Sequence, residues 1–319
     1  MRVNRSQKLP AGSWLAFAVI LAAAAAGFVW AGSFGAQAPN AAQAQAPAQA
    51  RAQAQTPAQT AGTASDDQVW REFIEWFRAA PPDPNALGAY AAELTRRSVS
   101  KEEIQRRFGV IMRLFATKSE GAEVFYDKTF SRPALTGKPE EDGFASVPSE
   151  FLVGAVEGVP PGRALDLGMG QGRNAVALAK AGWAVTGVDV SGEAVTAAKR
   201  NAAAAGVALD GIKSDYASFD FGRDSWDLVA MIFAWAPIDE PAFVERVRAS
   251  LKPGGRVVFE NFVSTPERPY APMVRALPPG ATREAFAGFE IVSYEELTGT
   301  GDWGGPGSRL VHMIARRPK

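Results

Sequence analysis

The sequence predicts a doubly wound α/β fold with a mainly parallel sheet, preceded by a helical module. Residues 163–182 have the pattern of a strand, a glycine-rich loop and a helix, and a second β-rich run ends at Asp189. Residues 226–233 form a nearly continuous apolar run of strand length, which is typical of the centre of a parallel sheet covered on both faces. This alternation of strand and helix patterns indicates parallel strands joined by crossover helices.

The composition excludes several classes of protein. The 319 residues include no cysteine and a single histidine, His312, so neither a disulfide scaffold nor a metal site is expected. The 34 basic and 34 acidic residues balance, but residues 1–65 contain basic residues and no acid, which leaves the remainder mildly acidic. A nucleic-acid-binding surface needs a clustered excess of Lys and Arg, so no nucleic-acid partner is expected.

Residues 1–35 have the pattern of a signal peptide or a membrane anchor. Basic residues precede an uncharged, apolar stretch over residues 14–32. Its length lies between the roughly 7–15 residues of a cleaved signal and the about 20 of a spanning helix. Positive charges before such a stretch predict export of the polypeptide C-terminal to it. We therefore expect an exported (periplasmic) protein or one attached to the membrane through residues 14–32, with catalysis facing the cytosol as the alternative.

Two segments separate this N-terminus from the α/β pattern. Residues 36–65 are rich in Ala, Gln and Pro without large apolar side chains, and are expected to form a disordered linker. Residues 66–130 carry apolar side chains at helical spacing and include the capping-box pattern of Ser100 and Glu103, so a helical module is predicted. Its aromatic stripe is expected to pack against the next domain, residues 131–319.

The glycine loop has the features of a ligand-binding turn. Gly168, Gly170 and Gly172 allow a ligand to approach the backbone where a Cβ atom would collide. Asp189 can accept hydrogen bonds from both hydroxyl groups of a ribose. A turn without a ligand and a nicotinamide dinucleotide site are the alternatives. The dinucleotide site is disfavoured because its fingerprint has the last glycine one residue later, where this chain has Arg173.

Five motifs succeed one another in a characteristic order. They are Leu165-Asp166-Leu-Gly168-x-Gly170-x-Gly172, Asp189, Ser214-Asp215-Tyr216, Trp226-Asp227-Leu228 and Leu251-Lys-Pro-Gly-Gly255. Together they resemble the class I S-adenosylmethionine-dependent methyltransferases, over about residues 125–319. Within that class, the loop continuing into Arg173 and Asn174 is similar to the small-molecule group that includes tellurite-resistance and thiopurine-type enzymes. The resemblance implies a seven-stranded Rossmann-like sheet whose last strand is antiparallel.

The resemblance also implies S-adenosyl-L-methionine as the cofactor. The glycine loop would cradle its methionine part, Asp189 would bind the ribose, and Asp215 with Tyr216 would address the adenine. The end of the fourth strand, Phe233 to Trp235, would face the transferred methyl group. The implied cofactor-binding residues are Asp166, Gly168, Met169, Gly170, Gly172, Asp189, Val190, Asp215, Tyr216 and Phe233.

Methyl transfer to a small-molecule acceptor by in-line displacement mainly requires that donor and acceptor be held in line and water excluded. No catalytic residue is therefore assigned. A hydroxyl or amine acceptor would benefit from a general base, for which Tyr126, Asp127, Glu260 and Tyr270 are candidates by position. The alternative function is an exported or anchored binding module that keeps the fold without turnover.

The C-terminal segment completes the expected sheet. Residues 289–294 and 310–315 are predicted strands, joined by a glycine-rich loop that contains Trp303. His312 lies within the second of these strands, where a structural role is favoured over that of a base. Residues 264–283 are expected to carry substrate specificity. The identity of the methyl acceptor and the oligomeric state are not predicted.

Overall fold

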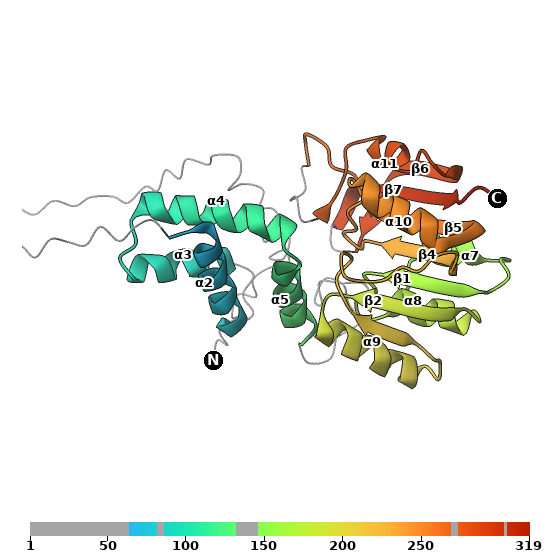
Figure 1. Cartoon of the computed structure of the whole chain (residues 1–319), viewed down its shortest axis with the longest axis horizontal. Coiled ribbons are helices and arrows are strands. Elements are labelled where there is room, and N and C mark those ends of the chain that lie inside the picture. Colours follow the sequence, from blue (N-terminus) through green and yellow to red (C-terminus); the bar gives the residue numbers. More distant parts are fainter. Residues whose placement is uncertain (1–63, 82–85, 132–145, 269–273, 303–304) are drawn as a thin grey trace, which may run out of the picture.

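The computed structural model describes residues 64–81, 86–131, 146–268, 274–302 and 305–319 (Figure 1). A seven-stranded sheet of order β3-β2-β1-β4-β5-β7-β6 forms its centre, and a group of helices lies to one side of it. Strand β7 is antiparallel to both of its neighbours, and the other neighbouring strands are parallel. The predicted doubly wound, mainly parallel Rossmann-like fold is confirmed. The strands are β1 (Arg163–Leu167), β2 (Ala184–Asp189), β3 (Asp210–Lys213), β4 (Trp226–Ile232), β5 (Leu251–Phe262), β6 (Glu290–Gly301) and β7 (Gly305–Arg316).

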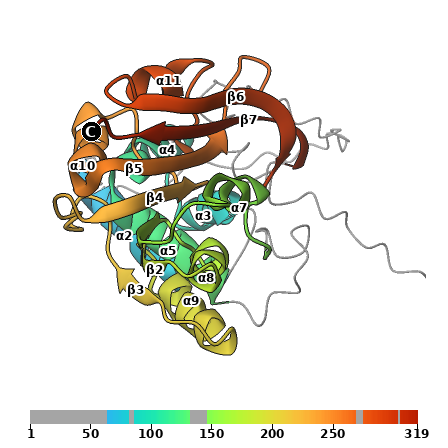
Figure 2. The ribbon, with the colours of Figure 1, turned by 90° about the vertical axis from the view of Figure 1, so that its right-hand side faces the viewer.

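Helices cover both faces of the sheet. Helices α7 (Glu150–Val156) and α8 (Arg173–Lys180) pack on one face, and α10 (Pro241–Ser250) and α11 (Ala281–Ala285) lie on the other (Figure 2). Helix α9 (Gly192–Ala204) lies beside β2 and β3. Strand β4 is almost fully buried, as its continuous apolar run predicts.

The N-terminal helical group consists of α2 (Asp66–Ala79), α3 (Ala86–Arg96), α4 (Lys101–Thr117) and α5 (Ser119–Phe130). The Ser100 hydroxyl accepts a hydrogen bond from the Glu103 amide, so the predicted cap of α4 is confirmed. The aromatic stripe packs largely within this group: the Phe73 ring lies 5.2 Å from Tyr90, and the Trp70 ring lies 6.2 Å from Phe115. The expected packing against the next domain is made mainly by α5.

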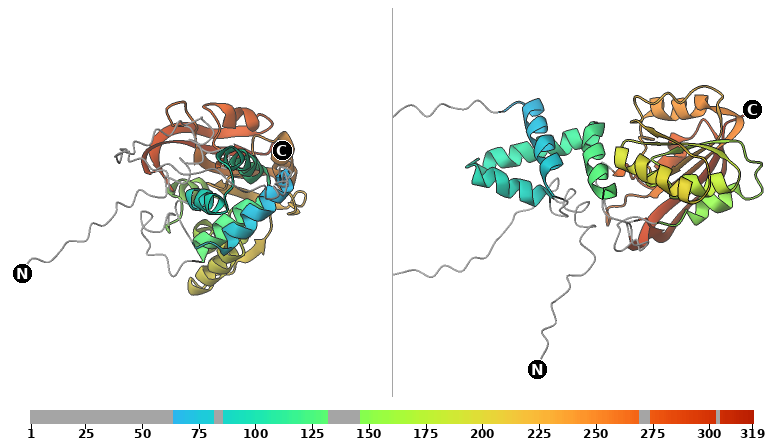
Figure 3. Two further views of the ribbon diagram at one scale, coloured as in Figure 1. Left: turned by 90° about the vertical axis from the view of Figure 1, so that its left-hand side faces the viewer. Right: turned by 90° about the horizontal axis from the view of Figure 1, so that it is seen from below.

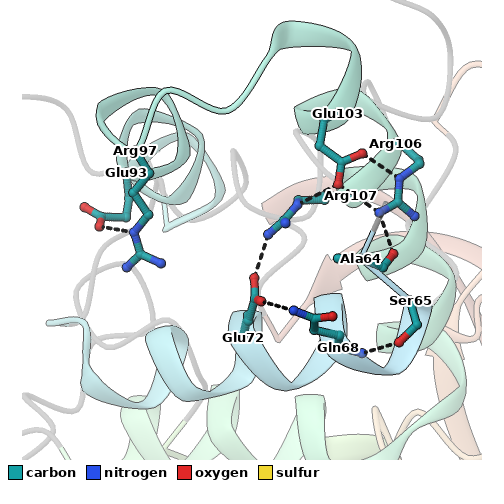
Figure 4. A network of polar contacts seen from close by, with 9 residues as sticks. All are labelled: Ala64, Ser65, Gln68, Glu72, Glu93, Arg97, Glu103, Arg106 and Arg107. Atoms are coloured by element: carbon teal, nitrogen blue, oxygen red, sulfur yellow. Dashed lines mark hydrogen bonds and ion pairs between the residues drawn. The ribbon is translucent and has the colours of Figure 1, made fainter. Parts of the chain in front are cut away.

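A polar network joins α2 to α4 on the surface of this helical group (Figure 4). The Arg107 guanidinium donates to Glu72 at 2.6 Å and to Glu103 at 2.9 Å. Arg106 donates to Glu103 and to the carbonyl oxygen of Ala64, which holds the start of α2 against α4. Because Arg107 is mostly buried and contacts two carboxylates, this network fixes the angle between the two helices more firmly than isolated surface pairs would.

Helix α5 connects the helical group to the sheet domain (Figure 3). It also crosses α2 and α4 closely, since a Cβ atom at Gly121 would lie 3.0 Å from both the Trp70 and the Phe115 rings. The sequence does not distinguish α5 as a separate helix. Its twelve residues mix small, charged and aromatic side chains, so no clear apolar stripe marks it.

The C-terminal hairpin differs from the expectation. The glycine-rich segment after residue 297 is predicted to be a loop, but β6 continues to Gly301 and β7 begins at Gly305. A side chain at Gly301 would collide with the ring of Phe262, so glycine permits this close strand packing. Trp303 lies outside the described residues, as do residues 1–63 and therefore the expected signal or anchor. In the described part of the chain, no helix is long and apolar enough to span a membrane.

Candidate cofactor-binding site

A pocket of about 340 Å³ lies at the carboxyl ends of β1, β2 and β4. The strand order reverses at β1, and in open α/β sheets this edge is where ligands bind. The sheet domain forms one side of the pocket, and the α4–α5 turn with α5 forms another. Of the residues predicted to bind a cofactor, those that line the pocket are Gly168, Met169, Gly170, Asp189, Val190, Asp215, Tyr216 and Phe233.

The remaining two predicted residues, Asp166 and Gly172, lie beside the pocket and do not line it. Gly172 has a φ of 82°, and a Cβ atom there would lie 2.8 Å from the Cβ atom of Ala198. This glycine therefore allows α9 to pack against the loop, and its role differs from the predicted direct contact with the ligand. Asp166 is 1% exposed and lies beneath the loop at the end of β1.

Gly168 is required by the close approach of three segments. Its φ is 68°, and a Cβ atom would lie 2.7 Å from the Tyr216 hydroxyl and 3.0 Å from Ala234. The Tyr216 hydroxyl donates a hydrogen bond of 2.6 Å to the carbonyl oxygen of Ala234. The glycine loop, the segment after β3 and the segment after β4 are thereby held together around the pocket.

Asp189 presents a buried carboxylate to the pocket. One oxygen accepts a hydrogen bond from the Gly170 amide and the other from the Ser191 amide, each at 2.9 Å. Burial raises its pKa to about 6, although the two amides act in the opposite direction. Each carboxylate oxygen has a second lone pair with which to accept a ribose hydroxyl.

Asp166 carries a buried oxygen, Oδ2, that has no hydrogen-bond partner among the residues that the structure describes. The Ala175 amide donates to this carboxyl group, and burial raises its pKa to about 7, with Arg173 lowering it and Asp189 raising it further. A buried acceptor without a partner is costly unless a ligand or water satisfies it. The Asp166 carboxylate therefore fits the ammonium group of a methionine-derived cofactor.

Asp215 lines the same pocket from the segment after β3. Its Oδ1 accepts the Ser218 amide at 2.7 Å, and its Oδ2 accepts the hydroxyl of Ser119, from α5, at 2.9 Å. Burial acts to raise its pKa, but the hydrogen bonds from Ser218 and Ser119 leave it below the ordinary value. The carboxylate is thus a stable anionic acceptor, which suits the amino group of an adenine.

The segment after β4 is strained and aromatic. Phe233 and Trp235 both have a φ of 51°, a conformation that is rare outside glycine and that persists where the surroundings impose it. The Trp235 ring lies 5.2 Å from Tyr126 and 6.5 Å from Phe125, both on α5. With Phe130, these side chains make an aromatic wall, defined here as Tyr126, Phe130, Phe233 and Trp235.

The structure separates the candidate general bases. Tyr126 lines the pocket, but burial raises its pKa well above the ordinary value, so it keeps its proton near neutral pH. Asp127, on α5, accepts the Ser191 hydroxyl at 2.6 Å beside the start of α9 and does not line the pocket. Glu260 accepts the Ser149 hydroxyl at 2.5 Å and contacts His312 at 3.1 Å, also outside the lining. Tyr270 lies outside the described residues.

His312 and Asp227, which the sequence analysis also names, make contacts within the fold. The His312 ring stacks on Phe151 at 4.2 Å, which agrees with its expected structural role. Asp227 accepts the Arg163 amide and pairs with Lys252 at the amino end of the sheet. Among the described residues, no group of His, Asp and Glu could hold a metal ion.

Several pocket residues are not found by sequence reasoning. Arg173 pairs with Asp302, whose pKa burial raises to about 6, and donates to the Val147 carbonyl oxygen. Arg275 pairs with Asp239 and Glu240 at another part of the rim. In the sequence, Arg173 is noted as a departure from a dinucleotide fingerprint and as part of the loop that resembles the small-molecule group, and Arg275 lies within the segment expected to carry specificity. No sequence signal indicates the pairs that these two residues form.

The glycine loop, the acids after β2 and β3, and the sheet order are features of a known family. Residues 164–255 match the model of the methyltransferase domain family. Over this segment the chain is similar to a methyltransferase domain. S-adenosyl-L-methionine is the cofactor of this domain, as the motif resemblance implied.

Curated relatives match only part of this chain. Hemagglutinin 1 of Eikenella corrodens is 30% identical over 173 residues, which is 51% of this chain and 57% of that protein. The demethylmenaquinone methyltransferase of Renibacterium salmoninarum is 31% identical over 142 residues, covering 42% and 58%. The chain thus spans less than three fifths of the length of these relatives. The solved structure of TehB from Haemophilus influenzae aligns with a TM-score of 0.46 at 19% identity, covering 61% of this chain and 66% of that one.

Proposed function

We propose that this chain transfers a methyl group from S-adenosyl-L-methionine to a small-molecule acceptor by in-line displacement. The observation that carries the proposal is that two carboxylates line one pocket and a third lies buried beside it. Asp189 suits the ribose, Asp215 suits the adenine, and the unsatisfied oxygen of Asp166 suits the ammonium group. The aromatic wall then forms the side of the pocket that is left for the acceptor.

The chain's contribution to the reaction is positioning and exclusion of water. S-adenosyl-L-methionine supplies a methyl group that its sulfonium already activates. The glycine loop and Asp189 fix the donor, and the aromatic wall holds the acceptor against it in a site of low polarity. Tyr126 keeps its proton, so it does not remove a proton from an acceptor. An acceptor that is already nucleophilic fits this site best.

The aromatic wall also favours a planar, apolar acceptor. Stacked or edge-on contacts with aromatic rings stabilise flat ligands without requiring particular polar groups. Two relatives bear names that refer to menaquinone or ubiquinone methylation, the protein of Renibacterium salmoninarum and a C-methyltransferase of Geotalea daltonii that is 33% identical over 122 residues. These names support, for this chain, an acceptor with a quinol-like ring.

We further propose that residues 1–35 direct export or membrane attachment and that residues 36–65 act as a tether. An apolar acceptor that partitions into a membrane is compatible with such an attachment. The alternative, an exported or anchored binding module without turnover, is favoured by one consideration: S-adenosyl-L-methionine is a cytosolic metabolite. Binding and turnover must therefore be measured separately.

The decisive experiment is calorimetric titration of S-adenosyl-L-methionine, S-adenosyl-L-homocysteine and NAD into the purified chain. Asp189→Asn is expected to weaken binding of the first two by about 1–3 kcal/mol, because it removes charge-assisted acceptors. Asp210→Asn is the matched control. Asp210 is the first residue of β3, at the amino ends of the strands and away from the pocket, so this variant should bind the cofactor as the wild type does. Absence of binding by the wild type, or equal affinity of the two variants, would contradict the cofactor assignment.

Turnover is then tested with a labelled methyl group. Transfer to reduced quinones in the presence of the wild-type chain would support the methyltransferase function. Binding of the cofactor without transfer to a panel of quinols, catechols and thiols would favour the non-catalytic module.

A further inference from the structure

The contacts of α5 point to a role for the helical group in the cofactor site. We propose that Ser119 is a cofactor-binding residue on the adenine side, and that docking of α5 on the sheet domain completes the site. This inference rests on the proposed function, and in particular on Asp215 as the adenine acceptor. It extends the site to residues outside the segment that matches the family model, residues 164–255.

Three polar contacts tie α5 to the segments that carry the cofactor-binding acids. The Ser119 hydroxyl donates to Asp215 at 2.9 Å, directly after β3. Glu123 pairs with Lys213, at the end of β3, at 2.7 Å. Asp127 accepts the hydroxyl of Ser191, two residues after Asp189, at 2.6 Å. All three reach the carboxyl edge of the sheet, where the ligand binds.

These contacts differ in what they can do. The Lys213–Glu123 pair is largely exposed and contributes little to docking. Asp127 also accepts the Glu193 amide at 3.3 Å, so it stabilises the start of α9 as well as the interface. Ser119, by contrast, lines the pocket and bonds to a carboxylate that lines it too. Of the three α5 residues, only Ser119 is placed to touch both Asp215 and a ligand.

Ser119 lies at the turn between α4 and α5. It is the first residue of α5, and Ala116 to Lys118 before it also line the pocket. A hydroxyl group both donates and accepts, so Ser119 can keep its bond to Asp215 while accepting a hydrogen bond from an adenine amino group. The α4–α5 turn thereby supplies an edge of the adenine subsite that the sheet domain does not supply itself.

Docking and cofactor binding are then linked. A ligand that contacts both α5 and the sheet domain binds the docked arrangement more tightly and stabilises it by the same free energy. Loss of the Ser119 hydroxyl should weaken cofactor binding without unfolding the sheet domain. If Ser119 only helped to attach α5, its loss would leave the affinity for the cofactor unchanged, provided that α5 stays docked through its apolar contacts.

The test compares two serines at the two ends of α5 in the full chain. Ser119→Ala is expected to weaken binding of S-adenosyl-L-homocysteine about threefold to tenfold in calorimetric titration, the range for one hydrogen bond. Ser131→Ala removes a hydroxyl that, among the described residues, donates to the Lys128 carbonyl oxygen at the same helix end, and this variant should bind as the wild type does. Equal affinity of the two variants would overturn the assignment of Ser119. If the wild type does not bind at all, the proposed function fails instead, so the two failures are distinguishable.

A second measurement tests docking directly and exploits the absence of cysteine from the chain. Asp127→Cys combined with Ser191→Cys places two thiols where the present side chains are in contact, and the test uses the fraction in which oxidation has linked α5 to the start of α9. The oxidised form should bind S-adenosyl-L-homocysteine at least as tightly as the same sample after reduction. Loss of binding on oxidation that is restored by reduction would show that docked α5 excludes the cofactor, and would overturn the proposal.

Discussion

Asp166→Asn should stabilise the fold near neutral pH while weakening cofactor binding. Asp166 is buried, one of its oxygens lacks a partner among the described residues, and burial raises its pKa to about 7. A carboxyl group whose pKa is higher in the folded than in the unfolded chain stabilises the fold below the unfolded pKa. That stabilisation is lost as the pH rises through the folded pKa. For Asp166 the loss extends from about pH 4 to about pH 7.

The size of the effect follows from the two pKa values. A change from the ordinary 3.8 to about 7 corresponds to at most about 4 kcal/mol of lost stability above pH 7, at about 1.4 kcal/mol per pKa unit. The Asn amide keeps an acceptor for the Ala175 amide but places two N–H donors in a buried position, which costs about 1–3 kcal/mol. We therefore expect a net gain of about 1–3 kcal/mol at pH 8.

The assay is urea unfolding of the wild type and the variant at pH 4 and pH 8, without cofactor. The variant should be the more stable protein at pH 8 and should lose this advantage at pH 4, where the wild-type carboxyl group is protonated in the fold. The other buried acids of the site are common to both proteins, and the measured difference includes the charge interaction between Asp166 and Asp189. The reasoning is refuted if the difference in free energy of unfolding is the same at both pH values.

Two further predictions concern the elements that position the site. Gly172→Ala should lower the free energy of unfolding, measured with urea, by about 2–4 kcal/mol. The residue has a φ of 82°, and the new methyl group would lie 2.8 Å from Ala198. An unchanged free energy of unfolding would show that α9 can shift at little cost. Ser100→Ala should lower the free energy of unfolding by about 0.5–2 kcal/mol, because it removes the hydrogen bond that caps the Glu103 amide. Ser100→Thr should keep most of this stability. Equal melting temperatures of the wild type and both variants would show that the cap does not stabilise the protein.

The sheet could be predicted from the sequence because its signals are local. The apolar run of β4, the glycine loop and the acid at the end of β2 each arise from a few adjacent residues, and their order determines the topology. The contents of the pocket are predicted less completely. The pairing of Arg173 with Asp302 joins residues 129 positions apart, and no period or motif in the sequence reports such a contact.

The same distinction explains one prediction that the structure revises. Gly172 belongs to the loop motif, and the motif leads to the prediction that it contacts the ligand. The structure instead places Gly172 against Ala198, whereas Asp166 of the same motif is buried with one oxygen that has no partner among the described residues. Spacing identifies residues that a loop conformation requires, but it does not distinguish those that face the ligand from those that permit the packing behind it.

The pocket is lined partly by residues inside the segment that matches the family model and partly by residues outside it, and this affects which acceptors should be tested. The segment that matches the family model, residues 164–255, supplies the glycine loop, Asp189 and Asp215. Tyr126 and Phe130 come from α5, before that segment, and Asp302 comes from after it. Likeness to the family model therefore covers much of the cofactor side of the pocket and two members of the aromatic wall, Phe233 and Trp235, whereas the rest of that wall lies outside the matched segment. Acceptor screening should accordingly pair each candidate with variants of the aromatic wall, since only an acceptor whose affinity changes with Tyr126→Ala or Phe130→Ala contacts that wall.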